Sequence, residues 1–165
     1  MKMRSLVAPA AFLQAVIVLM GIGALAFMLW EPHLEGRNAH ATPFEIYFED
    51  PFLAYVYLGS VPFFAGLHQA IKALGYVRQG RVISHAAVSA LRNMKYCAFI
   101  SAGTIAAGVA ILLVAARSTH EDAAGAAMLG FIATFGSIVA GTTAMMFERI
   151  LQGVVDGGSG NDSRA

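Results

Sequence analysis

Four long apolar runs, separated by charged connectors, constrain the fold of this chain more than any other feature. The connectors alternate in sign: the first and third are acidic and the second is basic. A helix needs about 20 mostly apolar residues to cross the roughly 30 Å hydrocarbon core of a bilayer. Each of the four runs is long enough to do so. The predicted spans are residues 6–30, 51–76, 94–116 and 123–150.

The composition indicates a lipid environment rather than an aqueous one. Of the 165 residues, 58% are hydrophobic and only 13% are charged, too few charges for the surface of a soluble domain of this length. In lipid the backbone must satisfy its own hydrogen bonds, which favours helices. We therefore expect an all-α fold in which residues 1–153 form one integral membrane domain, a bundle of four transmembrane helices. Residues 154–165 are expected to form a disordered cytoplasmic tail.

The positions of the basic residues predict the orientation of the bundle. With four spans, the two termini and the connector after the second span share one side of the membrane. Nine of the 11 lysines and arginines fall on that side, and only Arg37 and Arg117 fall on the other. The positive-inside rule then predicts that both termini are cytoplasmic. The protein is expected to be a multi-pass protein of the bacterial cytoplasmic (inner) membrane.

Local signals predict how the spans are joined and packed. Gly80 should end the second helix, and Ser84 is suited to cap a short cytoplasmic helix that runs into span three. Pro62 should kink span two, whose aromatic residues are expected to contact lipid and core. Small residues recur every four positions in spans three and four, so these helices can approach closely. We expect that contact within one chain, with a homodimer as the alternative. The small residues are Ala98, Ala102, Ala106, Ala110, Ala126, Gly130, Ala133, Ser137, Gly141, Ala140 and Ala144.

The basic connector contains the first group of candidate site residues. Arg78, Arg81, Arg92 and Lys95 are candidates for binding anionic lipid head groups or an acidic patch on a cytosolic protein. Membrane topology alone would also account for them. Glu148, at the end of span four, is expected to pair with Arg92 or Lys95.

His68, Gln69 and Lys72 form a second, intramembrane polar group. An ionisable residue at membrane depth suggests haem ligation, proton relay or ligand recognition. A single histidine makes a poor metal or proton path, however. A hydrogen bond from His68 to Gln69, to a backbone carbonyl or to a neighbouring helix is therefore the simpler interpretation. Cys97, the only cysteine, is a packed small residue or a palmitoylation site.

The segment from residue 55 to residue 97 reads YVYLGSVPFFAGLHQAIKALGYVRQGRVISHAAVSALRNMKYC. It resembles bacterial membrane proteins grouped as domain of unknown function 2975. That family has no established activity, but its members look like neighbours of small helix-turn-helix repressors of the Xre type. The resemblance therefore implies a role in membrane-linked regulation. It rests on the aromatic, proline-containing span and on Gly80, Val82, Ser84, Ala90, Leu91, Arg92, Lys95 and Tyr96.

The sequence contains no motif that points to catalysis. No hydrolase triad, phosphate loop, two-histidine metal pattern or dinucleotide fingerprint is present, and no basic surface suits direct contact with nucleic acid. We therefore expect no enzymatic activity, catalytic residue, metal or cofactor. The favoured function is a non-enzymatic regulatory or sensory component that acts with a cytosolic partner such as a helix-turn-helix regulator. The alternatives are a haem-binding subunit, or a small transporter, channel or export subunit whose polar path would contain Gln14, His68, Thr104, Thr134 and Thr142.

Overall fold

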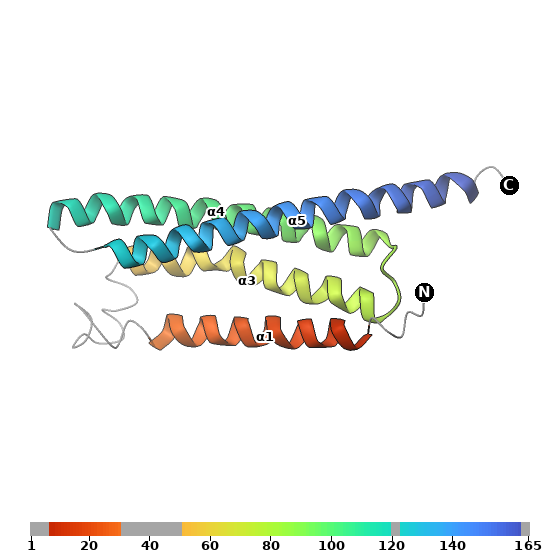
Figure 1. Ribbon diagram of the computed structural model, residues 1–165, viewed down its shortest axis with the longest axis horizontal. Helices are drawn as coiled ribbons and strands as arrows, with labels where there is room; N and C mark the ends of the chain where they lie inside the picture. Colours follow the sequence, from red (N-terminus) through yellow and green to blue (C-terminus); the bar gives the residue numbers. More distant parts are fainter. Residues whose placement is uncertain (1–6, 31–50, 120–122, 163–165) are drawn as a thin grey trace.

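The computed structural model describes residues 7–30, 51–119 and 123–162. These residues form four helices: α1 (Val7–Trp30), α3 (Pro51–Arg78), α4 (His85–Thr119) and α5 (Ala124–Asp162). The helices lie side by side with their axes roughly along one direction (Figure 1). The start of α1, the turn between α3 and α4, and the end of α5 all lie at one end of the molecule (Figure 1). The prediction of an all-α helical bundle is confirmed.

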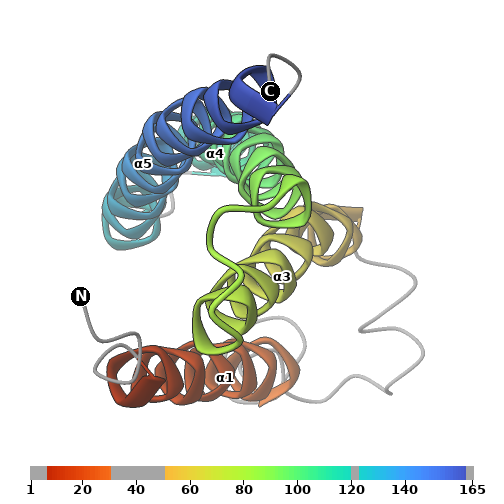
Figure 2. The same cartoon turned by 90° about the vertical axis from the view of Figure 1, so that its right-hand side faces the viewer.

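The helices form an open arc. Each helix packs on the next one along the chain: α1 on α3, α3 on α4, and α4 on α5. Viewed from the end, α1 and α5 stand at the two tips of the arc, and the middle of the arc consists of α3 and α4 (Figure 2). One side of the bundle is therefore concave and is lined by all four helices.

Three of the helices are long and apolar enough to cross a membrane. Over the most apolar 18 residues of each helix, the mean hydropathy is 2.4 within Val7–Trp30, 2.3 within His85–Arg117 and 1.7 within Ala124–Gly157. Helix α3, with 28 residues, is long enough but less apolar, because it contains tyrosines, prolines, His68 and Gln69. It packs between α1 and α4, so two apolar helices flank it over its length.

The side chains are distributed as lipid requires. The buried apolar residues among those described are small: six alanines (10, 87, 90, 102, 127 and 144) and two valines (88 and 109). Large apolar side chains point outward instead, for example Leu19 at 67% exposed and Phe135 at 69% exposed. A soluble protein shows the opposite arrangement. Small residues inside and large ones outside are typical of helices that associate by close contact within a bilayer.

Close contact is clearest between α4 and α5. A Cβ atom added at Gly130 would overlap Val109 Cγ2, and one added at Gly141 would lie 3.2 Å from the Phe99 ring and 3.3 Å from Ala98 Cβ. The small residues of the two spans therefore meet within one chain, as predicted. Not all of them take part, because Ala106 and Ala110 are exposed.

The turn between α3 and α4 forms as its sequence predicts. Gly80 has a φ of 70°, and the N–H groups of Gly80 and Arg81 donate to the carbonyls of Val77 (3.1 Å) and Tyr76 (2.9 Å). This pair of bonds is a Schellman motif, which ends a helix at a left-handed glycine. Ser84 Oγ then accepts a 3.2 Å bond from the Ala87 N–H and caps α4. From there α4 continues without a break through the predicted third span.

The last helix is longer than the sequence indicates. We expect from the sequence that residues 154–165 are disordered, but α5 continues through Asp162. Extending an existing helix adds one hydrogen bond per residue without the cost of a new nucleus. Glycines weaken a helix by only about 1 kcal/mol each relative to alanine, so a helix already formed can run on into such a segment.

Candidate functional site

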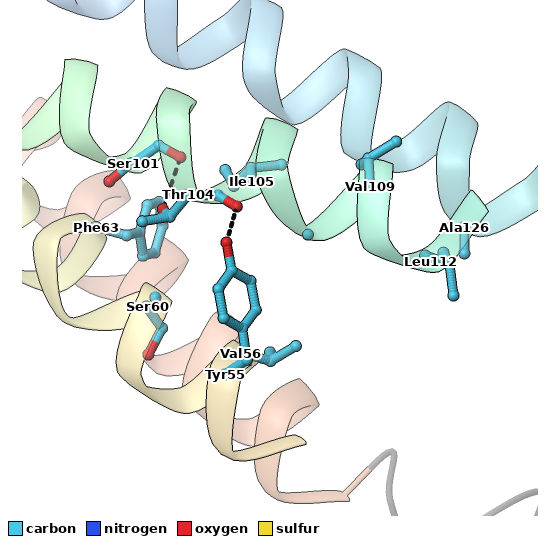
Figure 3. A pocket seen from close by; sticks show the side chains of 12 residues that line it. Tyr55, Val56, Ser60, Phe63, Ser101, Thr104, Ile105, Val109, Leu112 and Ala126 are labelled. Atoms are coloured by element: carbon cyan, nitrogen blue, oxygen red, sulfur yellow. Dashed lines mark hydrogen bonds between the residues drawn. The ribbon is translucent and has the colours of Figure 1, made fainter. Parts of the chain in front are cut away.

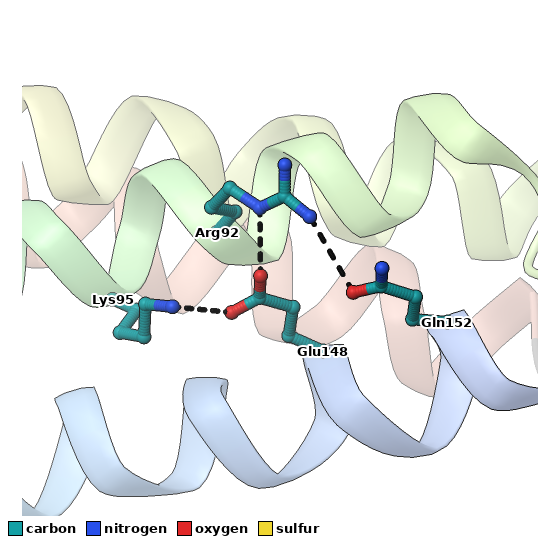
Figure 4. Close-up of polar contacts among 4 residues, drawn as sticks. All are labelled: Arg92, Lys95, Glu148 and Gln152. Carbon is teal, nitrogen blue, oxygen red and sulfur yellow. Dashed lines mark hydrogen bonds and ion pairs between the residues drawn. The ribbon is translucent and has the colours of Figure 1, made fainter.

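The principal polar cluster joins the N-terminal part of α4 to the C-terminal half of α5 (Figure 4). Arg92 Nε donates to Glu148 Oε1 at 2.7 Å, and Lys95 Nζ donates to Glu148 Oε2 at 2.7 Å. Arg92 Nη2 also donates to Gln152 Oε1 at 3.4 Å. The sequence predicts that Glu148 pairs with one of the two cations, and the structure pairs it with both.

The members of this cluster differ in exposure. Glu148 is only 5% exposed, and a buried carboxylate is tolerated when it is paired and hydrogen-bonded. The side chain of Lys95 is 15% exposed and that of Arg92 is 47% exposed. Lys95 Nζ also lies 4.7 Å from the centre of the Tyr96 ring, a favourable cation–π distance. Glu148 therefore fixes both cations, while the guanidinium of Arg92 still reaches the surface.

A polar hollow of about 280 Å³ opens beside this cluster. It lies between the first turns of α4 and residues 152–156 of α5. Its walls carry both signs of charge. The lining residues are His85, Val88, Ser89, Arg92, Gln152, Val155 and Asp156.

The other two predicted basic residues lie apart from the cluster. Arg78 Nη1 donates to Gln14 Oε1 at 2.8 Å, and Gln14 Nε2 donates to the carbonyl of Ile71 at 2.9 Å. These bonds attach α1 to α3. Arg81 is exposed in the turn, and its side chain has no hydrogen bond or ion pair with the residues that the structure describes.

Within the described part of the chain, the structure brings no other polar side chain into contact with the intramembrane polar group. His68 and Lys72 are exposed and Gln69 is half-buried on α3, and none of their side chains bonds another described residue. No group of three or more possible metal ligands occurs among residues 7–30, 51–119 and 123–162. The hydroxyls of Thr104, Thr134 and Thr142 donate to carbonyls of their own helices and form no polar path between helices.

Two apolar cavities lie between the helices, and sequence reasoning did not find them. The α3–α4 cavity, about 380 Å³, lies beside Tyr55, whose hydroxyl donates to the Thr104 carbonyl at 2.6 Å (Figure 3). The central cavity, about 460 Å³, lies on the concave side of the arc and is lined by all four helices. The sequence feature that could have predicted these cavities is the set of glycines and small residues in α3 to α5. A small side chain can leave empty space between helices as well as allow them to approach closely.

Taken together, the fold and the polar end define an integral membrane protein with four helices. The family described as "Protein of unknown function (DUF2975)" matches residues 34–162, which include α3 to α5 and leave α1 outside. The chain belongs to this family, which confirms the resemblance seen in its sequence. An uncharacterized membrane protein of Bacillus subtilis (strain 168), YoaS, is 32% identical over 152 residues, covering 92% of this chain and 94% of the relative. No solved structure matches the chain.

Proposed function

We propose that this protein is a non-enzymatic regulatory component of the bacterial cytoplasmic membrane. Its basic inner end binds a cytosolic protein such as a helix-turn-helix regulator. The observation that carries this proposal is the polar end that α4 and α5 build together beyond the length a span requires. The membrane character of the B. subtilis relative supports the location.

Helix length supports a surface outside the hydrocarbon. Helix α5 has 39 residues, which at 1.5 Å per residue is about 58 Å. The hydrocarbon core is only about 30 Å thick. Much of the length of α5 that exceeds the hydrocarbon thickness lies at the end where α5 extends past its neighbours (Figure 1). Gln152 and Asp156 of the polar hollow lie on α5 just before this extension, beside the start of α4.

The charge of this end favours an acidic partner. Arg81 is exposed in the turn, Arg149 is exposed on α5, and Arg92 is half-exposed above Glu148. Complementary charge speeds association and selects partners. Because Glu148 holds Arg92 in place, its half-exposed guanidinium would present the same geometry to each partner molecule.

The test compares the exposed arginines of this end with a matched arginine at the other end. A two-hybrid screen with the full chain would use the small helix-turn-helix regulators encoded in the same genome. Arg81→Gln with Arg149→Gln should abolish an interaction that the unmodified chain shows. Arg117→Gln, an exposed arginine near the opposite end of α4, should leave it intact. Equal interaction for all three chains, or none for the unmodified chain, would count against the proposal.

A further inference from the structure

The central cavity and the α3–α4 cavity share three lining residues, and one of these residues carries a buried hydroxyl group with no hydrogen-bond partner in the described part of the chain. Phe63, Ser101 and Ile105 line both cavities. Ser101 is 2% exposed, and its Oγ has no hydrogen-bond partner among the residues that the structure describes. Figure 3 shows Ser101 next to Phe63 at one end of the α3–α4 cavity. A buried hydroxyl without a partner costs about 1–3 kcal/mol in proteins, so this position favours a bound molecule that supplies one.

The other hydroxyls of the α3–α4 cavity are already bonded. Tyr55 Oη donates to the Thr104 carbonyl, Ser60 Oγ to the Tyr57 carbonyl, and Thr104 Oγ1 to the Ser101 carbonyl. Ser101 thus differs from its neighbours, since a serine in a helix commonly bonds a carbonyl one turn back. Ser137 of α5 adds a second hydroxyl to the wall of the central cavity.

The remaining walls restrict the chemistry of the bound molecule. None of the residues that line the two cavities is an acid, a lysine, an arginine or a histidine. A charged ligand would therefore lose its hydration without gaining an ion pair. The volumes, about 380 and 460 Å³, lie within the usual range of small-molecule pockets. The site suits an apolar molecule with one uncharged oxygen.

The open arc supplies a route for such a molecule. All four helices line the central cavity, and α1 and α5 stand apart at the tips of the arc (Figure 2). The concave side of a membrane-embedded arc faces lipid, so a molecule dissolved in the bilayer can enter sideways.

We propose that these two neighbouring cavities bind a neutral lipid alcohol from the bilayer, with its oxygen accepting a hydrogen bond from Ser101 and its chain lying against Phe63 and Ile105. This binding goes beyond the regulatory function proposed above. A failed search for a cytosolic partner would leave it unaffected, and a failed binding test would leave the docking proposal unaffected.

The test is photolabelling of the full chain in phosphatidylcholine nanodiscs. The probe is hexadecanol carrying a diazirine, and the comparison probes are a diazirine hydrocarbon without oxygen and a diazirine phosphatidylglycerol. We expect the alcohol probe to label peptides of α3 to α5 that line the cavities. Unlabelled hexadecanol should compete with it. Ser101→Ala should lower the labelling about five- to tenfold, the effect of losing one hydrogen bond.

Two leucine variants test the location. A Cβ atom added at Gly136, which lines the central cavity, meets nothing within 4 Å, so the backbone accommodates a larger residue there, and we expect the side chain of Gly136→Leu to occupy the cavity. Gly103 has the same free space but lines neither cavity. Gly136→Leu should remove the labelling and Gly103→Leu should keep it, with thermal melting of each variant confirming that it is folded.

Several results would overturn the proposal. Equal labelling by the hydrocarbon probe, unaffected by Ser101→Ala, would mean that the cavities hold lipid tails only. Equal labelling by the phosphatidylglycerol probe would remove the preference for a neutral molecule. Labelling that hexadecanol does not displace, or that Gly136→Leu does not reduce, would place the probe on the outer surface.

Discussion

At the scale of single residues, Glu148 has the largest electrostatic role in the described part of the chain. It is nearly inaccessible to solvent and holds one cation on each carboxylate oxygen. Removing one partner of a buried ion pair leaves the other charge uncompensated, which costs more than the pair itself contributes. The loss of the carboxylate should cost more at Lys95 than at Arg92, because the Lys95 side chain is far less exposed.

Glu148→Gln should therefore lower the free energy of unfolding by about 2 kcal/mol. This is less than for a fully enclosed pair because Arg92 remains half in solvent. The measurement is unfolding in mixtures of SDS and dodecylmaltoside. Arg149→Gln, next along the chain but exposed, should change stability little. A similar loss of stability for Glu148→Gln and Arg149→Gln would show that the ion pairs of Glu148 stabilise the fold no more than an exposed charge does.

Ser84 has a second residue-scale role, as the cap of α4. Ser84→Ala should destabilise the protein by about 1 kcal/mol, because the Ala87 N–H loses its acceptor. Ser84→Asp should restore most of the loss, since a carboxylate caps a helix and interacts well with its positive end. Thermal melting in detergent would measure both. A melt for Ser84→Asp as low as that for Ser84→Ala would argue against the capping role.

At the scale of helices, the contact between α4 and α5 depends on how closely their backbones approach. Gly130→Ala should destabilise the protein by about 1–2 kcal/mol relative to Gly136→Ala, because the new methyl group overlaps Val109. Both substitutions raise helix propensity equally, so their difference isolates the overlap. Thermal melting provides the comparison. Equal melting temperatures would mean that the helices separate readily at this point.

The limits of the four helices were largely predictable, but their packing was not. Apolar length locates the spans, and Gly80 and Ser84 mark one helix end and the next helix start by local backbone chemistry. The sequence did not predict where α5 ends, because a glycine-rich segment can either continue a helix or adopt an irregular conformation. Glycine spacing indicated that α4 and α5 touch, but free space at Gly136 and overlap at Gly130 depend on the facing helix.

In the candidate site too, the residue types that meet were predictable from the sequence, whereas their detailed geometry was not. Complementary charge predicted that Glu148 would meet a basic residue, because the two spans are antiparallel neighbours. The double pairing depends on the relative rotation of the helices, which a single sequence does not contain. The unpartnered hydroxyl of Ser101 was not predictable either, since it depends on the side-chain rotamer and on what lies opposite.

At the scale of the whole molecule, the orientation in the membrane is the most direct test. We predict that Gln79→Cys, in the turn between α3 and α4, is labelled by an impermeant maleimide only after cells are permeabilised. Trp30→Cys, at the other end of α1 and 69% exposed, should be labelled on intact cells. Cys97→Ser removes the background thiol in both cases. The reverse labelling pattern would invert the topology and place the basic end outside the cell.

The open arc also has a consequence for biosynthesis. Helix α1 is synthesised before α3, yet α3 provides the Tyr57 hydroxyl that bonds the Met28 carbonyl and the Ile71 carbonyl that receives Gln14. Until α3 leaves the ribosome, α1 has to remain in the bilayer as an isolated helix. The mean hydropathy of 2.4 over its most apolar 18 residues makes that stable. Insertion of α1 and its attachment to the rest of the protein are therefore two separate events in time.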